Sequence, residues 1–250
     1  MEKNRLPDTP FWVEPDSVGS DRLELTPEES HHLLHVHRAK PGAPFQATDG
    51  AGGFYECVLE SVNRRAAVGR IVERREGAGE LSRPIEILVG MPDRRAIEQI
   101  IEHTVPLGVT ALDFVVCERS GPGATMSPQR LVRLARVAKA ALKQSRRSRL
   151  PKLGSSPSLE AALGGTSDAG AVPGAWRRFL ADPDGKPFPP GRIQSTKAAI
   201  QLAVGPPGGF SEGERQLLIQ SGFSPISLGP TRLTTETAAL ALIGLVRNCL

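Results

Sequence analysis

Two short apolar segments near the C-terminus each stop abruptly at a glycine-containing turn. The first, residues 198–204, runs into Gly205-Pro206-Pro207-Gly208-Gly209, and the second, residues 225–228, runs into Gly229-Pro230. A segment with the pattern of a helix follows each turn, and Ser211 with Glu214 predicts a capping box after the first. Ligands of open α/β sheets bind at the carboxyl ends of the strands. The two turns therefore predict a ligand site made largely of backbone groups, because glycines let a ligand approach without a Cβ in the way.

The chain before these turns alternates strands and helices. Strands are expected at 85–89 and 112–116, and helices at 93–103 and from Ser127 to about residue 145. Such alternation is typical of a parallel sheet in an α/β domain. Residues 154–191 are rich in Gly, Pro, Ser and Ala, and they predict only a strand at 176–181.

Residues from about 10 to 75 predict a small β-rich unit. Strands are expected at 58–62 and 67–72, and a short helix at 27–36 with Thr26 as its N-cap. Residues 73–80 are polar and contain two glycines, which is typical of a linker. We therefore predict two domains, residues 1–77 and residues 78–250.

Cysteine usage and hydropathy limit the class of protein. The chain has 250 residues and three cysteines, Cys57, Cys117 and Cys249, without Cys-x-x-Cys spacing. This pattern argues against a disulfide framework or a zinc site and for a reducing compartment. No apolar run is long enough to cross a bilayer, and residues 1–8 lack the apolar core of a signal peptide. We expect a cytoplasmic protein.

Basic residues concentrate in one predicted helix and the segment after it. The formal net charge is only +4, but residues 130–152 hold nine basic side chains and no acidic one. The helical wheel separates the basic side chains from an apolar face. The basic face has two interpretations, an ordinary solvated surface or a surface that contacts RNA phosphates. Aromatic residues form 4% of the chain, which is too few for a broad base-stacking platform.

Four histidines lie close together at positions 31, 32, 35 and 37. His31 and His35 share a helical face, but catalytic zinc motifs place a glutamate between paired histidines, and this segment has none. We therefore expect no metal. Packing and RNA contact are the alternatives for His31, His32, His35 and His37.

Two groups of motifs carry a resemblance to a known family. In the N-terminal part they are His31-His32-Leu33 with Val36 and Arg38, Pro41-Gly42, and Asp49-Gly50. In the C-terminal part they are Leu107-Gly108-Val109, Glu118-Arg119-Ser120, Gln144-Ser145 with Arg146 or Arg147, Gly205-Pro206 with Gly208-Gly209-Phe210-Ser211, Leu228-Gly229-Pro230, and Thr235-Glu236-Thr237-Ala238. From about residue 31 onward the chain resembles the bacterial 16S rRNA uridine-N3 methyltransferases of the SPOUT superfamily.

The resemblance implies an architecture and a reaction. Members of that family have a PUA-like β-barrel followed by an α/β domain whose chain forms a trefoil knot, and the knot binds S-adenosylmethionine. Two subunits pack knot against knot. By resemblance, this chain is expected to be a homodimeric, S-adenosylmethionine-dependent rRNA methyltransferase that modifies N3 of a uridine in 16S rRNA of the small ribosomal subunit.

The resemblance also implies roles for individual residues. Cofactor contacts are expected from Val204, Gly205, Pro206, Gly208, Gly209, Leu228, Gly229, Leu233 and Thr235. The reaction must remove the N3 proton or offset the charge of the uracil anion. For this we expect Glu236 as base or organiser, and Arg119, Arg146 and Arg232 as anion stabilisers or phosphate clamps. RNA contacts are expected from Arg38, Arg133, Arg136, Lys139, Lys143 and Arg147.

Four positions depart from the family pattern. Pro106, Lys139 and Pro207 stand where the family has glutamate, and Thr234 stands where it has arginine. These departures leave the general base unassigned, because Glu236 also has a structural interpretation at a helix start. Two alternatives therefore stay open: a catalytically impaired RNA-binding protein of the same fold, and a methyltransferase of that fold with a different RNA target.

Overall fold

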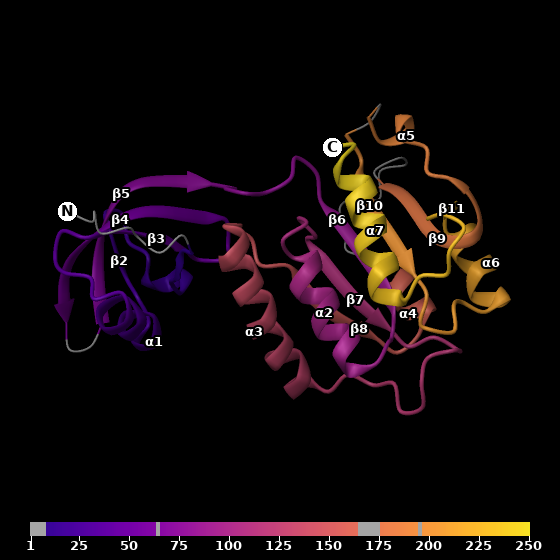
Figure 1. Ribbon diagram of the computed structural model, residues 1–250, viewed down its shortest axis with the longest axis horizontal. Coiled ribbons are helices and arrows are strands. Elements are labelled where there is room, and N and C mark those ends of the chain that lie inside the picture. The colour runs from indigo at the N-terminus through magenta and orange to yellow at the C-terminus, as the bar shows by residue number, and fades with distance from the viewer. Residues whose placement is uncertain (1–8, 64–65, 165–175, 195–196) are drawn as a thin grey trace. The chain divides into compact units, whose positions relative to one another are not determined.

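The computed structural model describes residues 9–63, 66–164, 176–194 and 197–250 (Figure 1). By their contacts these residues form two units. The first contains the described residues up to Glu80 together with Lys139–Leu150, and the second contains Leu81–Ala138 and Pro151–Leu250. The sequence predicts a single boundary after residue 77 and gives no sign that the chain returns to the first unit. Residues 1–8, where no signal peptide is expected, lie outside the described residues.

The first unit is built on one five-stranded sheet with the strand order β1-β3-β4-β5-β2. The strands are β1 (Phe11–Trp12), β2 (Arg22–Glu24), β3 (Pro44–Thr48), β4 (Gly53–Asn63) and β5 (Ala66–Glu76). β1 pairs with β3 in parallel, and the other pairs are antiparallel. Phe11, Leu33, Phe45 and Leu59 are among the side chains of the buried core, whose burial stabilises this unit.

Residues 73–76 correct one expectation, because they belong to β5 and are not a linker. They pair with the start of β4, from Gly53↔Glu76 to Glu56↔Glu73. The strand is polar, yet it is stabilised by cross-strand contacts. The Arg75 guanidinium lies 2.5 Å from the Glu56 carboxylate and 5.1 Å from the centre of the Phe54 ring. Polarity alone therefore does not separate a linker from a solvent-facing strand.

The predicted helix at 27–36 is confirmed as two consecutive turns. These are α1 (Pro27–His31) and a π-helical segment, η2 (His32–Val36). The Thr26 hydroxyl accepts a hydrogen bond from the Glu29 amide at 3.3 Å, as an N-cap does. A short 3₁₀ helix, η1 (Pro15–Ser17), precedes β2.

The second unit contains a six-stranded sheet in which every pair is parallel, with the order β11-β9-β10-β6-β7-β8. The strands are β6 (Ile85–Gly90), β7 (Ala111–Val115), β8 (Lys152–Ser156), β9 (Trp176–Pro187), β10 (Ala199–Val204) and β11 (Phe223–Ser227). The predicted α/β class with a parallel sheet is confirmed. All strands end at one edge, so the turns that follow them gather there.

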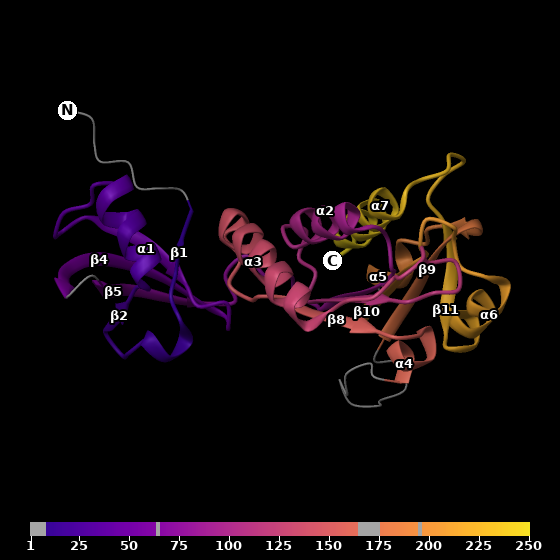
Figure 2. The same ribbon diagram turned by 90° about the horizontal axis from the view of Figure 1, so that it is seen from below.

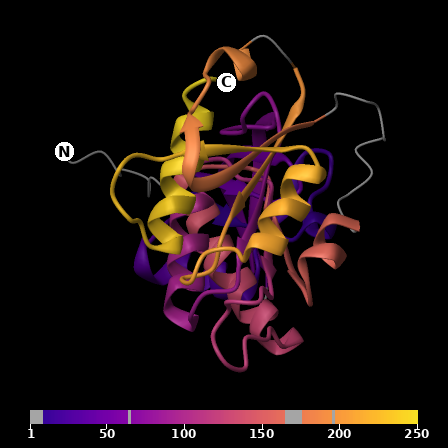
Figure 3. The same cartoon turned by 90° about the vertical axis from the view of Figure 1, so that its right-hand side faces the viewer.

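Helices cover both faces of this sheet. They are α2 (Arg94–Thr104), α3 (Pro128–Ser145), α4 (Leu159–Gly164), α5 (Gly191–Gln194), α6 (Glu212–Gln220) and α7 (Thr235–Arg247). Figures 2 and 3 show α2 and α7 on one face, and α4 and α6 on the other. Ser127 caps α3 through its hydroxyl, 3.2 Å from the Arg130 amide, and Asp93 caps α2 in the same way. Both helix starts agree with the sequence prediction.

The sheet differs from the sequence prediction in two strands. β8 is unpredicted, because an edge strand that reads Lys-Leu-Gly-Ser-Ser carries almost no apolar signal. β9 continues six residues beyond the predicted end at 181 and pairs with β11 there, where Gly185 lies against the Ile226 backbone. β9 also lies between β10 and β11, so the two strands that end in glycine turns are not neighbours in the sheet.

Candidate functional site

The turn after β10 is a tight loop held by its own backbone. The Gly209 amide donates to the Pro206 carbonyl at 2.7 Å, and Gly209 has a φ of +72°, which favours glycine. Ser211 and Glu214 form the predicted capping box at the start of α6, with a 2.8 Å bond from the Ser211 amide to Glu214. The turn therefore has one defined shape before any ligand binds.

The second glycine turn lies against the first, although β9 separates their strands. The Thr235 hydroxyl, at the first position of α7, donates to the Gly205 carbonyl at 3.0 Å. The Arg232 guanidinium lies 3.4 Å from the Pro207 carbonyl. Gly229, in the same segment, has a φ of +117° and open space around its Cα. The structure thus brings the turns at 205–209 and 229–235 together.

A third segment, the loop after β7, also joins the first turn. The Arg119 guanidinium donates to the carbonyls of Gly208 and Phe210 at 3.3 and 3.2 Å. The Glu118 amide donates to the Glu214 carboxylate at 2.8 Å. A Cβ on Gly208 would lie 2.9 Å from the Arg119 Cβ, so a glycine is needed for the two segments to approach this closely.

The end of β6 makes the closest approach to the same turn. A Cβ on Gly90 would lie 2.3 Å from both the nitrogen and Cδ of Pro206. The sequence assigned no role at this site to Gly90, and it gave Glu118 and Glu214 without any sign that they are bonded to each other. A glycine at the end of a predicted strand was the available signal for Gly90, whereas the link from Glu118 to Glu214 joins residues 96 positions apart and leaves no local pattern.

The predicted cofactor residues differ in burial in a way that fits a backbone site. Val204, Pro206 and Thr235 are buried, and Leu228 and Leu233 are half-buried. Gly208 and Gly229 are exposed. The surface offered by the converged turns is therefore mainly main chain with apolar edges, as an adenosine-sized ligand requires.

The predicted catalytic residues fall into different environments. Arg119 and Arg232 donate to main-chain carbonyls of the first turn, so they position that turn. Glu236 is half-buried in the first turn of α7, where the helix N-terminus stabilises a carboxylate. It makes no hydrogen bond or ion pair with the residues that the structure describes. Thr234, at the family's arginine position, is the N-cap of α7. Arg146 is exposed and belongs to Lys139–Leu150 of the first unit.

Most of the predicted RNA-contacting side chains already have protein partners. Arg133 pairs with Glu98 at 2.5 Å. Lys139 lies 3.5 Å from Glu14 and over the Trp12 ring, and Lys143 pairs with Glu29. Arg147 is 1% exposed and pairs with Glu80 at 2.6 Å. Arg38 and Arg136 are exposed. Arg147 is thus buried in the first unit, and its guanidinium is not presented to a ligand.

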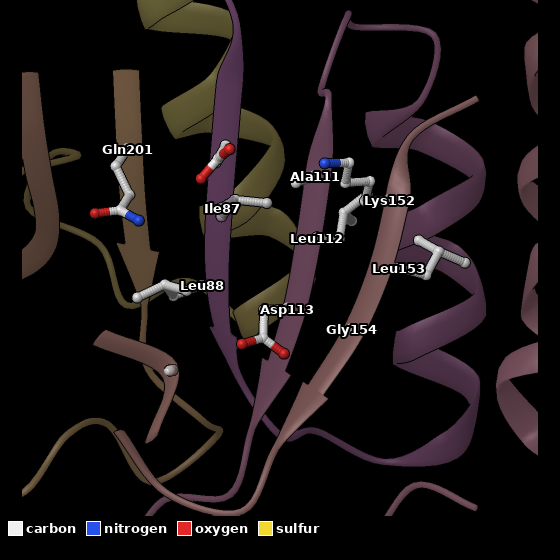
Figure 4. Close-up of a pocket in the computed structure, with 11 residues that line it drawn as sticks. Ile87, Leu88, Ala111, Leu112, Asp113, Lys152, Leu153, Gly154 and Gln201 are labelled. Carbon is white, nitrogen blue, oxygen red and sulfur yellow. The ribbon is translucent and has the colours of Figure 1, made fainter. Parts of the chain in front are cut away.

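A pocket of about 200 Å³ lies elsewhere, on the face of the sheet that α4 partly covers. Figure 4 shows Gln201 of β10, Asp113 of β7 and Lys152 of β8 around it. Gln201 is fully buried, and its carbonyl oxygen accepts from Arg178 at 2.9 Å. None of the predicted site residues lines this pocket. The described pocket and the converged turns are therefore different places on the second unit.

Asp113 gives the first testable prediction. Burial raises the pKa of its carboxyl above the ordinary value of about 3.9, and hydrogen bonding to Ser156 at 2.6 Å opposes this only partly. Because the folded state binds this proton more tightly, stability falls as the pH rises from the unfolded pKa through the raised folded pKa. We expect Asp113→Asn to remove this fall and to stabilise the protein at neutral pH. Urea unfolding between pH 4 and pH 8 measures it, with exposed Asp184→Asn as the control.

The lengths of the helices and the grouping of acidic, histidine and cysteine side chains bear on membranes and metals. No helix in the described part of the chain is long and apolar enough to span a bilayer. Among residues 9–63, 66–164, 176–194 and 197–250, no group of three or more His, Cys, Asp or Glu is placed to hold a metal ion. The histidines at 31–37 instead contact one another and Phe11 through their rings, for example His32 and His37 at 4.7 Å.

Two family models match the chain and together cover both units. The model of an RNA methyltransferase domain matches residues 79–247, and the model of an RNA methyltransferase PUA domain matches residues 25–72. Among curated proteins, the chain is similar to the ribosomal RNA small subunit methyltransferase E of Synechocystis sp., with 29% identity over 92% of this chain and 75% of that protein. The Bacillus subtilis protein of the same name is 27% identical over 87% of this chain and 86% of its own length.

Solved structures agree on the fold along almost the whole length. A probable rRNA-methyltransferase from Porphyromonas gingivalis superposes with a TM-score of 0.79 and 26% identity, covering 96% of this chain and 98% of that chain. A ribosomal RNA small subunit methyltransferase E from Neisseria gonorrhoeae, bound to S-adenosyl methionine, superposes with a TM-score of 0.81. It covers 96% of this chain and 97% of its own, and at 24% identity it supports the fold alone.

Proposed function

The chain belongs to the RNA methyltransferase family, and from this premise we propose that it transfers a methyl group from S-adenosylmethionine to N3 of a uridine in 16S rRNA. The family match covers the unit that contains the converged glycine turns. Curated relatives that align over most of the chain are named as methyltransferases of small-subunit ribosomal RNA. The observation that carries the proposal is the convergence of the turns at 205–209 and 229–235.

The converged turns have the chemistry to hold S-adenosylmethionine. No atom of the described residues outside the local chain lies within 4 Å of a Cβ built on Gly209 or Gly229, so the backbone there is open to a ligand. The half-buried Leu228 and Leu233 offer apolar contact to an adenine ring. When bound, S-adenosylmethionine supplies a methyl group on a sulfonium, which is already a good leaving group. The cofactor contacts are therefore proposed for residues 204–209, 228–229, 233 and 235.

The work left to the protein is to orient the uracil and to deal with its N3 proton. We assign Glu236 to this task as base or organiser, since its carboxylate starts α7 directly after Thr235, which is bonded to the turn. Arg119 and Arg232 hold the turn in shape from two sides, with guanidinium charge close to the reacting centre. Pro207, which replaces the family glutamate, stiffens the turn that both arginines bind.

Further parts of the proposal rest on the family. A trefoil knot is supported by the way the segment 229–235 is bonded to the turn at 205–209 while β9 lies between their strands. A homodimer and a domain division near residues 77–78 are likewise proposed from the likeness to the family. Arg38, Arg133 and Arg136 are the exposed RNA-contact candidates, and of these Arg133 is paired with Glu98. A cytoplasmic location is supported by an rRNA substrate and by three cysteines that are free in the structure.

Two measurements on the purified protein test the proposal. Calorimetry is expected to show binding of S-adenosylmethionine, and mass spectrometry of 16S rRNA incubated with enzyme and cofactor is expected to show one methylated uridine. Cofactor binding without any methylation would favour the catalytically impaired alternative. A methyl group on another nucleotide would favour the same-fold enzyme with a different target. No cofactor binding at all would contradict the site itself.

Substitution of Glu236 tests its assigned role. We expect Glu236→Gln to lower kcat by roughly 10²- to 10⁴-fold, because proton transfer by a positioned group contributes about that factor. The affinity for S-adenosylmethionine should stay unchanged in calorimetry. Glu212→Gln is the matched control, since Glu212 also lies in the first turn of a helix and is exposed. Equal kcat values for Glu236→Gln and Glu212→Gln would leave Glu236 with a structural role only.

A further inference from the structure

Helices α2 and α3 bring three arginines together in the second unit. The Arg133 guanidinium of α3 donates to the Glu98 carboxylate of α2 at 2.5 Å, which fixes the two helices side by side. Arg130 lies one turn before Arg133, and Arg94 lies one turn before Glu98. We call Arg94, Arg130 and Arg133 the arginine cluster.

The positive charge of the cluster is only partly neutralised by the protein. Glu98 pairs with Arg133, and the Asp93 carboxylate caps α2 through the Ala96 amide at 2.8 Å. Arg94 is exposed and forms no ion pair with the described part of the chain. Nη2 of Arg130 is buried and finds no hydrogen-bond acceptor among the described residues. The Arg130 side chain as a whole is half-buried, so its charge lies close to the surface, where an anion from outside the chain can offset it.

Electrostatics around Arg130 agree with this geometry. Its own burial and the charges of Arg94 and Arg133 lower the pKa of the Arg130 guanidinium, while Glu98 acts in the opposite direction. Three like charges that repel one another favour an anion between them.

The cluster lies at the edge of the sheet where the glycine turns gather. α2 starts four residues after Gly90, where a Cβ would lie 2.3 Å from Pro206 of the first turn. α3 starts after the loop whose Arg119 is bonded to Gly208 and Phe210. Figure 1 shows both helices beginning at the edge where β6 and β7 end. An anion held here would therefore lie on the same edge as the proposed methyl donor.

We propose that the arginine cluster is a phosphate-binding site for the RNA backbone, which holds the strand beside the proposed methyl-transfer site. The ligand is a phosphodiester, because a guanidinium fork matches two phosphate oxygens. Phosphate contacts fix the register of a nucleic acid without reading its sequence. The inference rests on the proposed function for the identity of the RNA, but the site itself depends only on the cluster.

Binding of a 16S rRNA transcript, measured by filter binding at 50–300 mM salt, tests the site. We expect Arg130→Gln and Arg94→Gln each to weaken binding about tenfold at low salt. Each should also reduce the slope of log K against log salt by roughly 0.7 to 0.9, the value for one lost phosphate contact. Arg130→Lys keeps the charge and should restore most of the slope. Arg247→Gln, an exposed arginine in the last turn of α7, is the matched control and should bind as the wild type does.

The outcomes separate this site from the proposed function. Wild-type slopes in folded Arg130→Gln and Arg94→Gln would overturn the cluster even if the enzyme methylates rRNA normally. If the two variants show reduced slopes but the wild-type protein methylates no rRNA, the phosphate-binding site is supported and the methyltransferase proposal is overturned. Thermal unfolding and calorimetry with S-adenosylmethionine check each variant, since affinity for the cofactor should not change. If Arg247→Gln loses as much RNA affinity as Arg130→Gln and Arg94→Gln do, only the net charge of the protein matters, and the site is overturned as well.

Discussion

Replacing Gly90 by alanine is expected to destabilise the second unit and to abolish binding of S-adenosylmethionine. The new methyl group would lie 2.3 Å from the nitrogen and Cδ of Pro206, far inside the 3.5–4.0 Å at which carbon atoms attract. Pro206 cannot rotate away, because its ring is part of the turn and its carbonyl is bonded to the Gly209 amide. Either β6 or the turn must shift. Overpacking of this kind costs about 1–3 kcal/mol.

The measurement is a pair of experiments on Gly90→Ala and on a control, Gly121→Ala. A Cβ on Gly121 meets no atom within 4 Å, so the same chemical change there should be neutral. Urea unfolding at constant m-value gives the loss of stability, and calorimetry gives the cofactor affinity. If Gly90→Ala binds S-adenosylmethionine as tightly as Gly121→Ala does, the close approach of β6 to the turn has no part in the site.

Removing the guanidinium of Arg147 is expected to cost the first unit roughly 3–5 kcal/mol, because it leaves a nearly buried carboxylate without its cation. Arg147 Nη2 lies 2.6 Å from Glu80, whose side chain is only 11% exposed. Glu80 also accepts hydrogen bonds from the Ser148 and Arg149 amides at 3.0 and 2.9 Å. The pair therefore holds the segment 147–149 in place, in addition to neutralising the charge of Glu80.

Two comparisons make this prediction specific. Arg147→Met is compared with Arg22→Met, which breaks the exposed pair with Glu60 and should barely move the urea midpoint. The double variant Arg147→Met with Glu80→Gln should recover much of the loss. Glutamine removes the unpaired charge and keeps an oxygen for the two amides. Similar midpoints for the two single variants would show that the pair is not buried in solution. Folded Arg147→Met is expected to bind RNA as tightly as the wild type does, because the Arg147 side chain is not presented at the surface.

Local features of the chain were predicted well from the sequence. The N-caps Thr26 and Ser127 and the capping box at Ser211 all stand where the pattern puts them. Each cap depends on a side chain and an amide that are three residues apart. A short stretch of sequence is therefore enough to predict it. The α/β class with a parallel sheet follows from alternation of strands and helices, which is local as well.

Interactions across long stretches of sequence could not be predicted in this way. The basic segment at 130–152 indicated a free RNA-binding face, yet Arg147 pairs with a carboxylate 67 positions away and Lys143 with one 114 positions away. The polar residues 73–76 indicated a linker, although a partner strand makes them part of a sheet. An edge strand such as β8 needs only one neighbour, so it carries little apolar signal of its own.

The amino-acid sequence by itself determined the two glycine turns, the helices behind them and the kind of ligand that bare backbone can hold. Tertiary structure decided which segments meet at the first turn: Thr235 from 30 positions away, Arg119 from 89, and Gly90 at the end of a strand. The reason is physical. A turn is fixed by the dihedral angles of its own few residues, whereas a site made of four segments exists only after the strands have paired in one order and brought their ends to one edge.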